Sequence, residues 1–199
     1  MFISNKPNLP INILISNNNK NNNLSAPWSS GFFYKNGREA ILTGIEKLGI
    51  KKGSRVLVPA YICSSVTEYL KFHGFELIFL DTNKNLTFDF SSIRGLIQTK
   101  SLDVIIMIDY FGFLSDQNIE IAKKIKKLND KVFIISDRCH SALSNRDIYF
   151  DYKIYDAIVF SIRKTIPNYD SGILFINNKN EQRVEIRKDV LMFFLFLIR

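Results

Sequence analysis

Lys164 is the residue of this sequence that most clearly suggests chemistry. It follows a short apolar run, Ala157 to Phe160, and precedes Pro167 and Gly172. A lysine directly after a buried strand is not in the usual position of a solvated surface lysine. A neutral lysine amine can act as a nucleophile or a base. The segment Ser161-Ile162-Arg163-Lys164 also matches the Ser-x-x-Lys pattern of penicillin-recognising enzymes, but their partner motifs are not found here.

A second candidate group is Ser136-Asp137-Arg138-Cys139-His140, which follows the apolar run Val132 to Ile135. An acid three residues before an imidazole could form a metal pair or a hydrolase dyad, or Asp137 could simply cap the following turn. The chain has only two histidines, and His73 lies far away in sequence. A three-ligand zinc site is therefore hard to assemble, and we expect no metal.

The elements that must position these residues recur along the chain, and regular structure is expected to begin near Gly37. Continuous apolar runs are typical of strands buried on both faces, as in a mainly parallel sheet. Six such runs occur, at Val56–Val58, Glu76–Leu80, Val104–Ile108, Val132–Ile135, Ala157–Phe160 and Ile173–Ile176. Helical patterns occur at Glu39–Leu48, Val66–Phe72 and Asn118–Leu128. The sequence predicts a three-layer α/β fold.

Polar residues gather where several of these runs end. Asp81, Asp109-Tyr110, Asp137 and Ser161 each fall at or just after an apolar run. Open α/β sheets bind ligands at the carboxyl ends of their strands. Any strand can end in a polar loop, so the set carries more weight than a single position.

Composition and charge limit the classes of partner. The chain has 199 residues, 46% of them hydrophobic, and a formal net charge of +8. Its densest basic group, residues 123–127, lies on a helix with an apolar opposite face, which favours a solvated surface over a nucleic-acid site. The longest apolar run, residues 190–198, is short of the about 20 residues that a membrane span needs. With no secretory signal, we expect a cytoplasmic protein without nucleic-acid or membrane partners.

Six segments in order resemble the DegT-type aminotransferases that act on nucleotide-linked keto-sugars, within the fold-type-I pyridoxal-phosphate (PLP) enzymes. The resemblance covers about Gly31 to Asn178. The segments are Asn36–Ile41, Lys51–Tyr61, Phe75–Asp81, Asp109–Gly112, Ser136–His140, and Phe160–Lys164 with Asp170–Gly172. No single segment is decisive, but their order and spacing together are specific.

The resemblance implies roles for individual residues. The cofactor phosphate would bind at the start of the helix at Gly37, Arg38 and Glu39, with Ser161 donating a hydroxyl. Asp137 would pair with the pyridine nitrogen, so that the ring acts as an electron sink. The remaining three residues would surround the ring: His140 at its 3-oxygen, Cys63 over its face, and Lys164 as the lysine that holds the cofactor covalently and moves the proton. We expect burial and the charge of Arg163 to favour the neutral Lys164 amine.

The resemblance also implies an activity and a domain organisation. The activity would be amino transfer, from glutamate or a similar donor, to a keto-sugar in polysaccharide or cell-surface sugar biosynthesis. Lys164 argues against the family's dehydratase branch, which has histidine there. We expect an irregular arm at 1–30, a PLP-binding large domain at 31–180, and a cut-off helix at 181–199. The small C-terminal domain of the family would then be missing, and a catalytically inactive remnant is the alternative. Because members of the family are dimers with active sites at the interface, the resemblance also implies a homodimer if the fold is intact.

Overall fold

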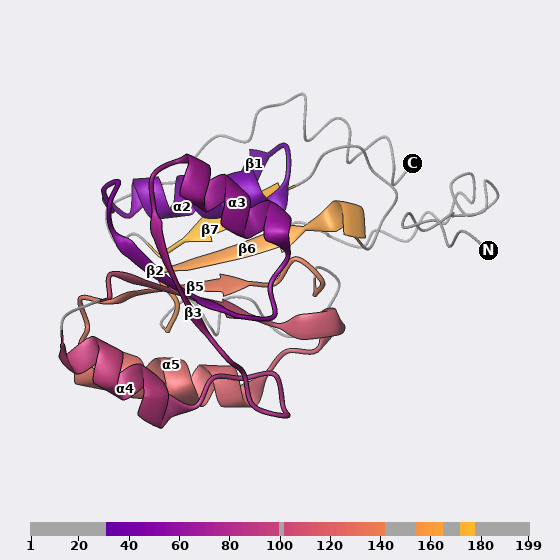
Figure 1. Ribbon diagram of the computed structural model, residues 1–199. Helices are drawn as coiled ribbons and strands as arrows, with labels where there is room; N and C mark the ends of the chain where they lie inside the picture. Colours follow the sequence, from indigo (N-terminus) through magenta and orange to yellow (C-terminus); the bar gives the residue numbers. More distant parts are fainter. Residues whose placement is uncertain (1–30, 100–101, 142–153, 165–171, 178–199) are drawn as a thin grey trace.

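A seven-stranded mixed sheet forms the centre of the computed structural model, which describes residues 31–99, 102–141, 154–164 and 172–177 (Figure 1). Across the sheet the strand order is β1-β7-β6-β5-β4-β2-β3. Strands β2 to β6 pair in parallel, whereas β7 runs antiparallel to β6, and β1 antiparallel to β7. The strands are β1 Phe32–Tyr34, β2 Arg55–Pro59, β3 Glu76–Leu80, β4 Val104–Ile108, β5 Phe133–Asp137, β6 Ala157–Ser161 and β7 Gly172–Ile176.

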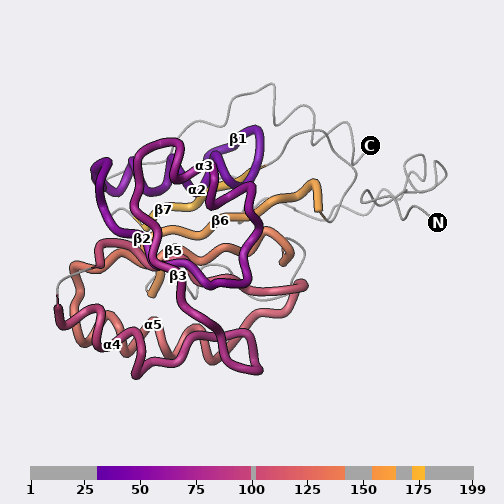
Figure 2. The backbone as a smooth tube through the Cα atoms, viewed as in Figure 1, coloured from indigo at the N-terminus to yellow at the C-terminus, as the bar shows by residue number. Residues whose placement is uncertain are grey.

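Helices cover both faces of the sheet. Helices α2 (Gly37–Lys47) and α3 (Ser64–Phe72) lie on one face, and α4 (Phe90–Gln98) and α5 (Asp116–Leu128) lie on the other, as the ribbon and the backbone tube both show (Figures 1 and 2). Two short 3-10 turns, η2 (Tyr110–Gly112) and η3 (Ile162–Lys164), follow β4 and β6. The predicted three-layer α/β architecture is confirmed.

The central strands are apolar on both faces because each face has its own helix layer. On β4, Val104 and Ile106 belong to the cluster under α2 and α3, while Ile105 and Met107 belong to the cluster over α4 and α5. All four side chains are essentially inaccessible to solvent. Period-two alternation therefore sorts apolar side chains between two cores, which explains the continuous apolar runs of the sequence.

Three features differ from the sequence-based expectation. Regular structure begins at β1, before Gly37, because a three-residue edge strand is too short to leave a pattern. Helix α4 was not anticipated, since Gly95 and two serines lower its intrinsic helix propensity. Strand β7 is antiparallel to its neighbour β6. The predictions for 1–30 and 181–199 lie outside the described residues. Among the residues that the structure describes, no helix has the length and apolar character to cross a membrane.

Candidate active site

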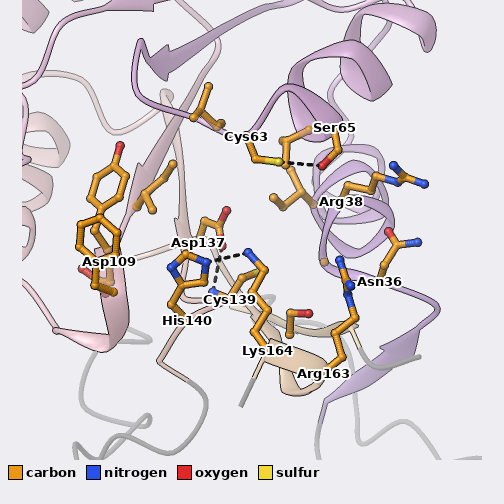
Figure 3. A pocket seen from close by; sticks show the side chains of 18 of the residues that line it. Asn36, Arg38, Cys63, Ser65, Asp109, Asp137, Cys139, His140, Arg163 and Lys164 are labelled. Carbon is orange, nitrogen blue, oxygen red and sulfur yellow. Dashed lines mark hydrogen bonds between the residues drawn. The ribbon is translucent and has the colours of Figure 1, made fainter. Parts of the chain in front are cut away.

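A cavity of about 610 Å³ opens where β4, β5 and β6 end and α2 begins (Figure 3). Strand register brings its residues together, since Asp137 on β5 pairs with Ile108 on β4 and Val159 on β6. Seven of the eight predicted site residues line this one cavity, namely Gly37, Arg38, Cys63, Asp137, His140, Ser161 and Lys164. The carboxyl-end location predicted for the site is therefore where the structure assembles it.

The start of α2 offers backbone donors to this cavity. Asn36 caps the helix, because its Oδ1 accepts from the amide of Glu39 at 3.0 Å and its carbonyl accepts from Ala40 at 3.1 Å. The two preceding amides, of Gly37 and Arg38, have no acceptor among the described residues. Free amides and the positive end of the helix dipole favour an anion at this position.

Ser161 adds a hydroxyl beside these amides. It is the last residue of β6 and is 1% exposed, yet its Oγ has no hydrogen-bond partner in the described part of the chain. A Cβ placed on Gly37 would lie 3.6 Å from the Ser161 Cβ, so the hydroxyl-bearing side chain adjoins the helix start. A buried hydroxyl without a partner costs stability, which a bound oxyanion would recover. We call these two amides and this hydroxyl the anion cradle.

Close backbone packing at the cradle requires glycine at two positions. A Cβ on Gly37 would lie 2.5 Å from the Cys139 Sγ. A Cβ on Gly172 would lie 2.5 Å from the carbonyl carbon of Asn36 and closer still to its oxygen. The first strand residue of β7 thus lies directly against the cap of α2, and a side chain at either position would force its neighbour to move.

Asp137, His140 and Lys164 form the other end of the cavity. The Asp137 carboxylate is 7% exposed and accepts from the Cys139 amide at 3.0 Å. Lys164 Nζ lies 2.8 Å from His140 Nε2, and Figure 3 shows the lysine reaching toward Asp137 and His140. Partial burial lowers the pKa of His140, the charge of Lys164 lowers it further, and Asp137 opposes both. A neutral imidazole at this site can accept the hydrogen bond from a protonated Lys164 amine.

The expectation that Lys164 would be buried is wrong. Both Lys164 and its neighbour Arg163 are exposed at the mouth of the cavity. The 3-10 turn η3 begins as β6 ends, which carries the chain out of the sheet within three residues. The lysine nitrogen is within hydrogen-bond distance of the polar His140 Nε2.

Cys63 stands on the opposite side of the cavity, at the N-cap of α3. Its Sγ lies 3.1 Å from the Ser65 Oγ, and hydrogen bonds from the Ser65 side chain and backbone lower the pKa of this exposed thiol. The second thiol, Cys139, is buried beneath Gly37, and burial raises its pKa well above the usual value. Cys63 is therefore the reactive thiol of the two.

Two residues predicted at the phosphate have different surroundings. Arg38 lines the cavity, but its guanidinium lies over the Tyr69 ring, 5.4 Å from the centroid. Glu39 does not line the cavity, its amide is used by Asn36, and its carboxylate accepts from the Lys35 amide at 3.2 Å. The sequence identified the right turn but could not tell which of its groups are free.

Sequence reasoning missed a buried ion pair at the cavity, whose acidic member, Asp109, is one of the lining residues. Arg138 Nε lies 3.0 Å from Asp109 Oδ2, and both side chains are 2% exposed. Ser136 Oγ accepts from the same nitrogen at 3.1 Å, while Asn118 Nδ2 donates to the other oxygen of Asp109 at 3.2 Å. An acid and a base that follow adjacent predicted strands were the only signal for this pair.

An aromatic pair at the cavity wall also escaped prediction. The rings of Tyr61 and Tyr110 stack at 5.6 Å between centroids, and the Tyr110 hydroxyl donates to the Tyr61 carbonyl at 2.6 Å. Burial raises the pKa of Tyr110, so this phenol stays protonated at neutral pH. The pair joins the ends of β2 and β4.

Comparison with known proteins identifies the family of this chain. Residues 32–184 match the model of the DegT/DnrJ/EryC1/StrS aminotransferase family. No curated protein matches the sequence.

Solved structures show the same fold. NtdA from Bacillus subtilis with bound PMP has a TM-score of 0.64 at 22% identity, over 75% of this chain and 33% of that one. A DegT DnrJ EryC1 StrS aminotransferase from Brucella abortus has a TM-score of 0.60 at 19% identity, over 79% and 48%. The dehydratase ColD with bound GDP-perosamine has a TM-score of 0.60 at 20% identity, over 75% and 40%. The chain spans a third to about half of their lengths, and by its family match it belongs to the DegT/DnrJ/EryC1/StrS aminotransferases.

Proposed function

We propose that this chain binds pyridoxal 5′-phosphate in the described cavity and transfers an amino group to a keto-sugar nucleotide. The observation that carries the proposal is the polarity of the cavity. An anion cradle lies at one end, and a carboxylate with a lysine amine lies at the other. The phosphate of the cofactor suits the first end, and its ring nitrogen suits the second.

The cradle fits the phosphate on grounds of hydrogen bonding. The amides of Gly37 and Arg38 and the Ser161 hydroxyl are donors without acceptors among the described residues. A bound phosphate oxygen would satisfy them in a site that excludes water from Ser161. Glu39 has no part in this proposal, because its amide already donates to Asn36.

Asp137, Lys164 and His140 supply the proton chemistry of the proposed reaction. When bound, the cofactor supplies an electron sink that stabilises charge on the substrate carbon. The Asp137 carboxylate would hold a proton on the ring nitrogen, and the Cys139 amide fixes one of its oxygens. Lys164 Nζ would move the substrate proton, and a neutral His140 can accept a hydrogen bond from that amine.

The keto-sugar part of the proposal rests on the family. ColD was solved with bound GDP-perosamine, a sugar nucleotide. The amino donor, homodimer formation and a role in polysaccharide or cell-surface sugar biosynthesis are parts of the same proposal. The cytoplasmic location expected from the sequence stays a prediction.

Cofactor binding and turnover are tested separately on the full chain. Purified protein is mixed with pyridoxal phosphate, reduced with borohydride and digested, and mass spectrometry locates the pyridoxyl group. We expect a single adduct at Lys164 that disappears in Lys164→Ala, while Lys124→Ala on the far helix α5 serves as the matched lysine control. Adducts spread over surface lysines would contradict the proposed site.

Amino transfer is then measured with glutamate and a panel of keto-sugar nucleotides. Formation of an amino sugar with loss on Lys164→Ala supports the enzyme. An adduct at Lys164 without transfer to any acceptor supports the alternative, a catalytically inactive chain that keeps the site.

A further inference from the structure

Arg163 is a cavity residue to which the proposed function gives no role. It lies in η3, two residues after Ser161 and directly before Lys164. Figure 3 shows the two neighbouring side chains diverging, with Lys164 toward Asp137 and Arg163 toward Asn36 at the start of α2. The guanidinium is thus carried to the same end of the cavity as the anion cradle.

The cradle itself contains no charged group. Its donors are two amides and a hydroxyl, whereas a phosphate monoester carries a charge of about −1.5 to −2 at neutral pH. The helix dipole supplies only about half a positive charge. A dianion held there needs a cation close by, particularly where Ser161 is shielded from water.

Three other basic residues line the cavity: Lys35, which precedes the cap of α2, and Arg38 and Lys164, whose charged groups have described partners. The Arg38 guanidinium lies over the Tyr69 ring, and the Lys164 amine contacts His140. Arg163 is exposed, and among the described residues no aromatic ring lies under its guanidinium as Tyr69 lies under that of Arg38.

The surroundings of Cys139 support this position for the Arg163 charge. The Cys139 Sγ lies directly against Gly37 of the cradle. Burial raises the pKa of this thiol, Asp137 raises it further, and the charges of Lys164 and Arg163 oppose the rise. The charge of Arg163 therefore acts on a thiol that adjoins the first residue of α2.

We propose that the Arg163 guanidinium is the counter-charge for the phosphate at the start of α2, and that it sets the preference of this chain for phosphorylated over unphosphorylated cofactor. The inference rests on the proposed function. A guanidinium presents a planar fork of donors that matches two phosphate oxygens, which a lysine cannot reproduce.

The test compares the affinities of the purified full chain for pyridoxal phosphate and for pyridoxal, each measured by absorbance titration. Arg163→Gln should weaken binding of the phosphate ester about 10- to 100-fold, the range for a lost charge-assisted contact. Binding of pyridoxal should be unchanged, since it lacks the phosphate. Arg163→Lys keeps the charge and should recover part of the loss.

Arg94→Gln is the matched control, because it removes the same charge from α4 on the opposite face of the sheet. It should leave both affinities unchanged. Equal weakening of both ligands by Arg163→Gln, or equal effects of the two substitutions, would overturn the role of Arg163 while leaving the proposed function intact. If the wild-type chain binds neither ligand, the proposed function fails and this inference fails with it. Thermal melting of each variant without cofactor confirms that the exposed substitutions leave the fold in place.

Discussion

The contact of Gly172 with the cap of α2 allows a substitution whose cost can be worked from the structure. In Gly172→Ala the added methyl would meet the Asn36 carbonyl, with its carbon at 2.5 Å, and the Gly37 nitrogen at 3.0 Å. These are backbone atoms, so no rotamer change relieves the overlap. Either β7 or the start of α2 must move. Overpacking of this kind costs about 1–3 kcal/mol, and we expect the upper part of that range.

Urea unfolding measures the effect on the free energy of unfolding. With a slope of about 2 kcal/mol per molar urea, a loss of about 2–3 kcal/mol should lower the midpoint by roughly 1 to 1.5 M. The same movement disturbs the amides of Gly37 and Arg38, so pyridoxal phosphate affinity should fall as well. Both losses should appear in the same variant.

Gly95→Ala is the matched control for this substitution. Gly95 lies inside α4, and a Cβ added there meets nothing within 4 Å. The same chemical change should therefore stabilise the protein by about 0.5–1 kcal/mol, through helix propensity alone. Equal stability of Gly172→Ala and the wild type would refute the close approach of β7 to α2.

Three other perturbations have defined outcomes. Arg138→Met should lower the free energy of unfolding by about 3–5 kcal/mol, because it leaves the Asp109 carboxylate buried without its cation. Burial already raises the pKa of Asp109. The loss of stability should therefore be smaller in urea titrations at acid pH, where that carboxyl group is neutral. Iodoacetamide should alkylate Cys63 before the buried thiol, and saturating pyridoxal phosphate should slow this reaction, as followed by mass spectrometry; equal labelling of both thiols would contradict the assignment. Lys164→Met should raise the pKa of His140 in an NMR titration, since the lysine charge is one of the two causes that lower it. Because the pKa of His140 is lower in the folded than in the unfolded chain, its contribution to stability is fully present above the unfolded pKa and is lost as the pH falls toward the folded pKa. Lys164→Met makes the two pKa values more alike, so this variant should lose less stability on acidification.

The strands were predictable because burial on both faces leaves a continuous apolar run. Val104–Ile108 was placed with the bounds that the structure has, and Ala157–Phe160 ended one residue before the strand does. The antiparallel direction of β7 left no comparable signal, because a five-residue apolar strand reads the same in either direction. Direction depends on the connection, not on the side chains.

The site was predictable where local sequence carries the geometry. Gly37 and Ser161 were reached through the family resemblance, which is carried by short segments that each begin or end an element. The ion pair between Asp109 and Arg138 was not predictable, because it depends on strand register across the sheet. The expected burial of Lys164 was wrong, because the course of the chain after β6 depends on how η3 leaves the sheet.

The order of the strands has a consequence for how the site comes into being during synthesis. Helix α2 is made early, but it packs on β6 and β7, which are made last among the described elements. Until Ile176 has left the ribosome, the start of α2 has neither Ser161 nor Gly172 beside it. Closing so long a stretch of chain carries a large entropy cost before any contact repays it. The anion cradle is therefore complete only after β6 and β7 have joined the sheet.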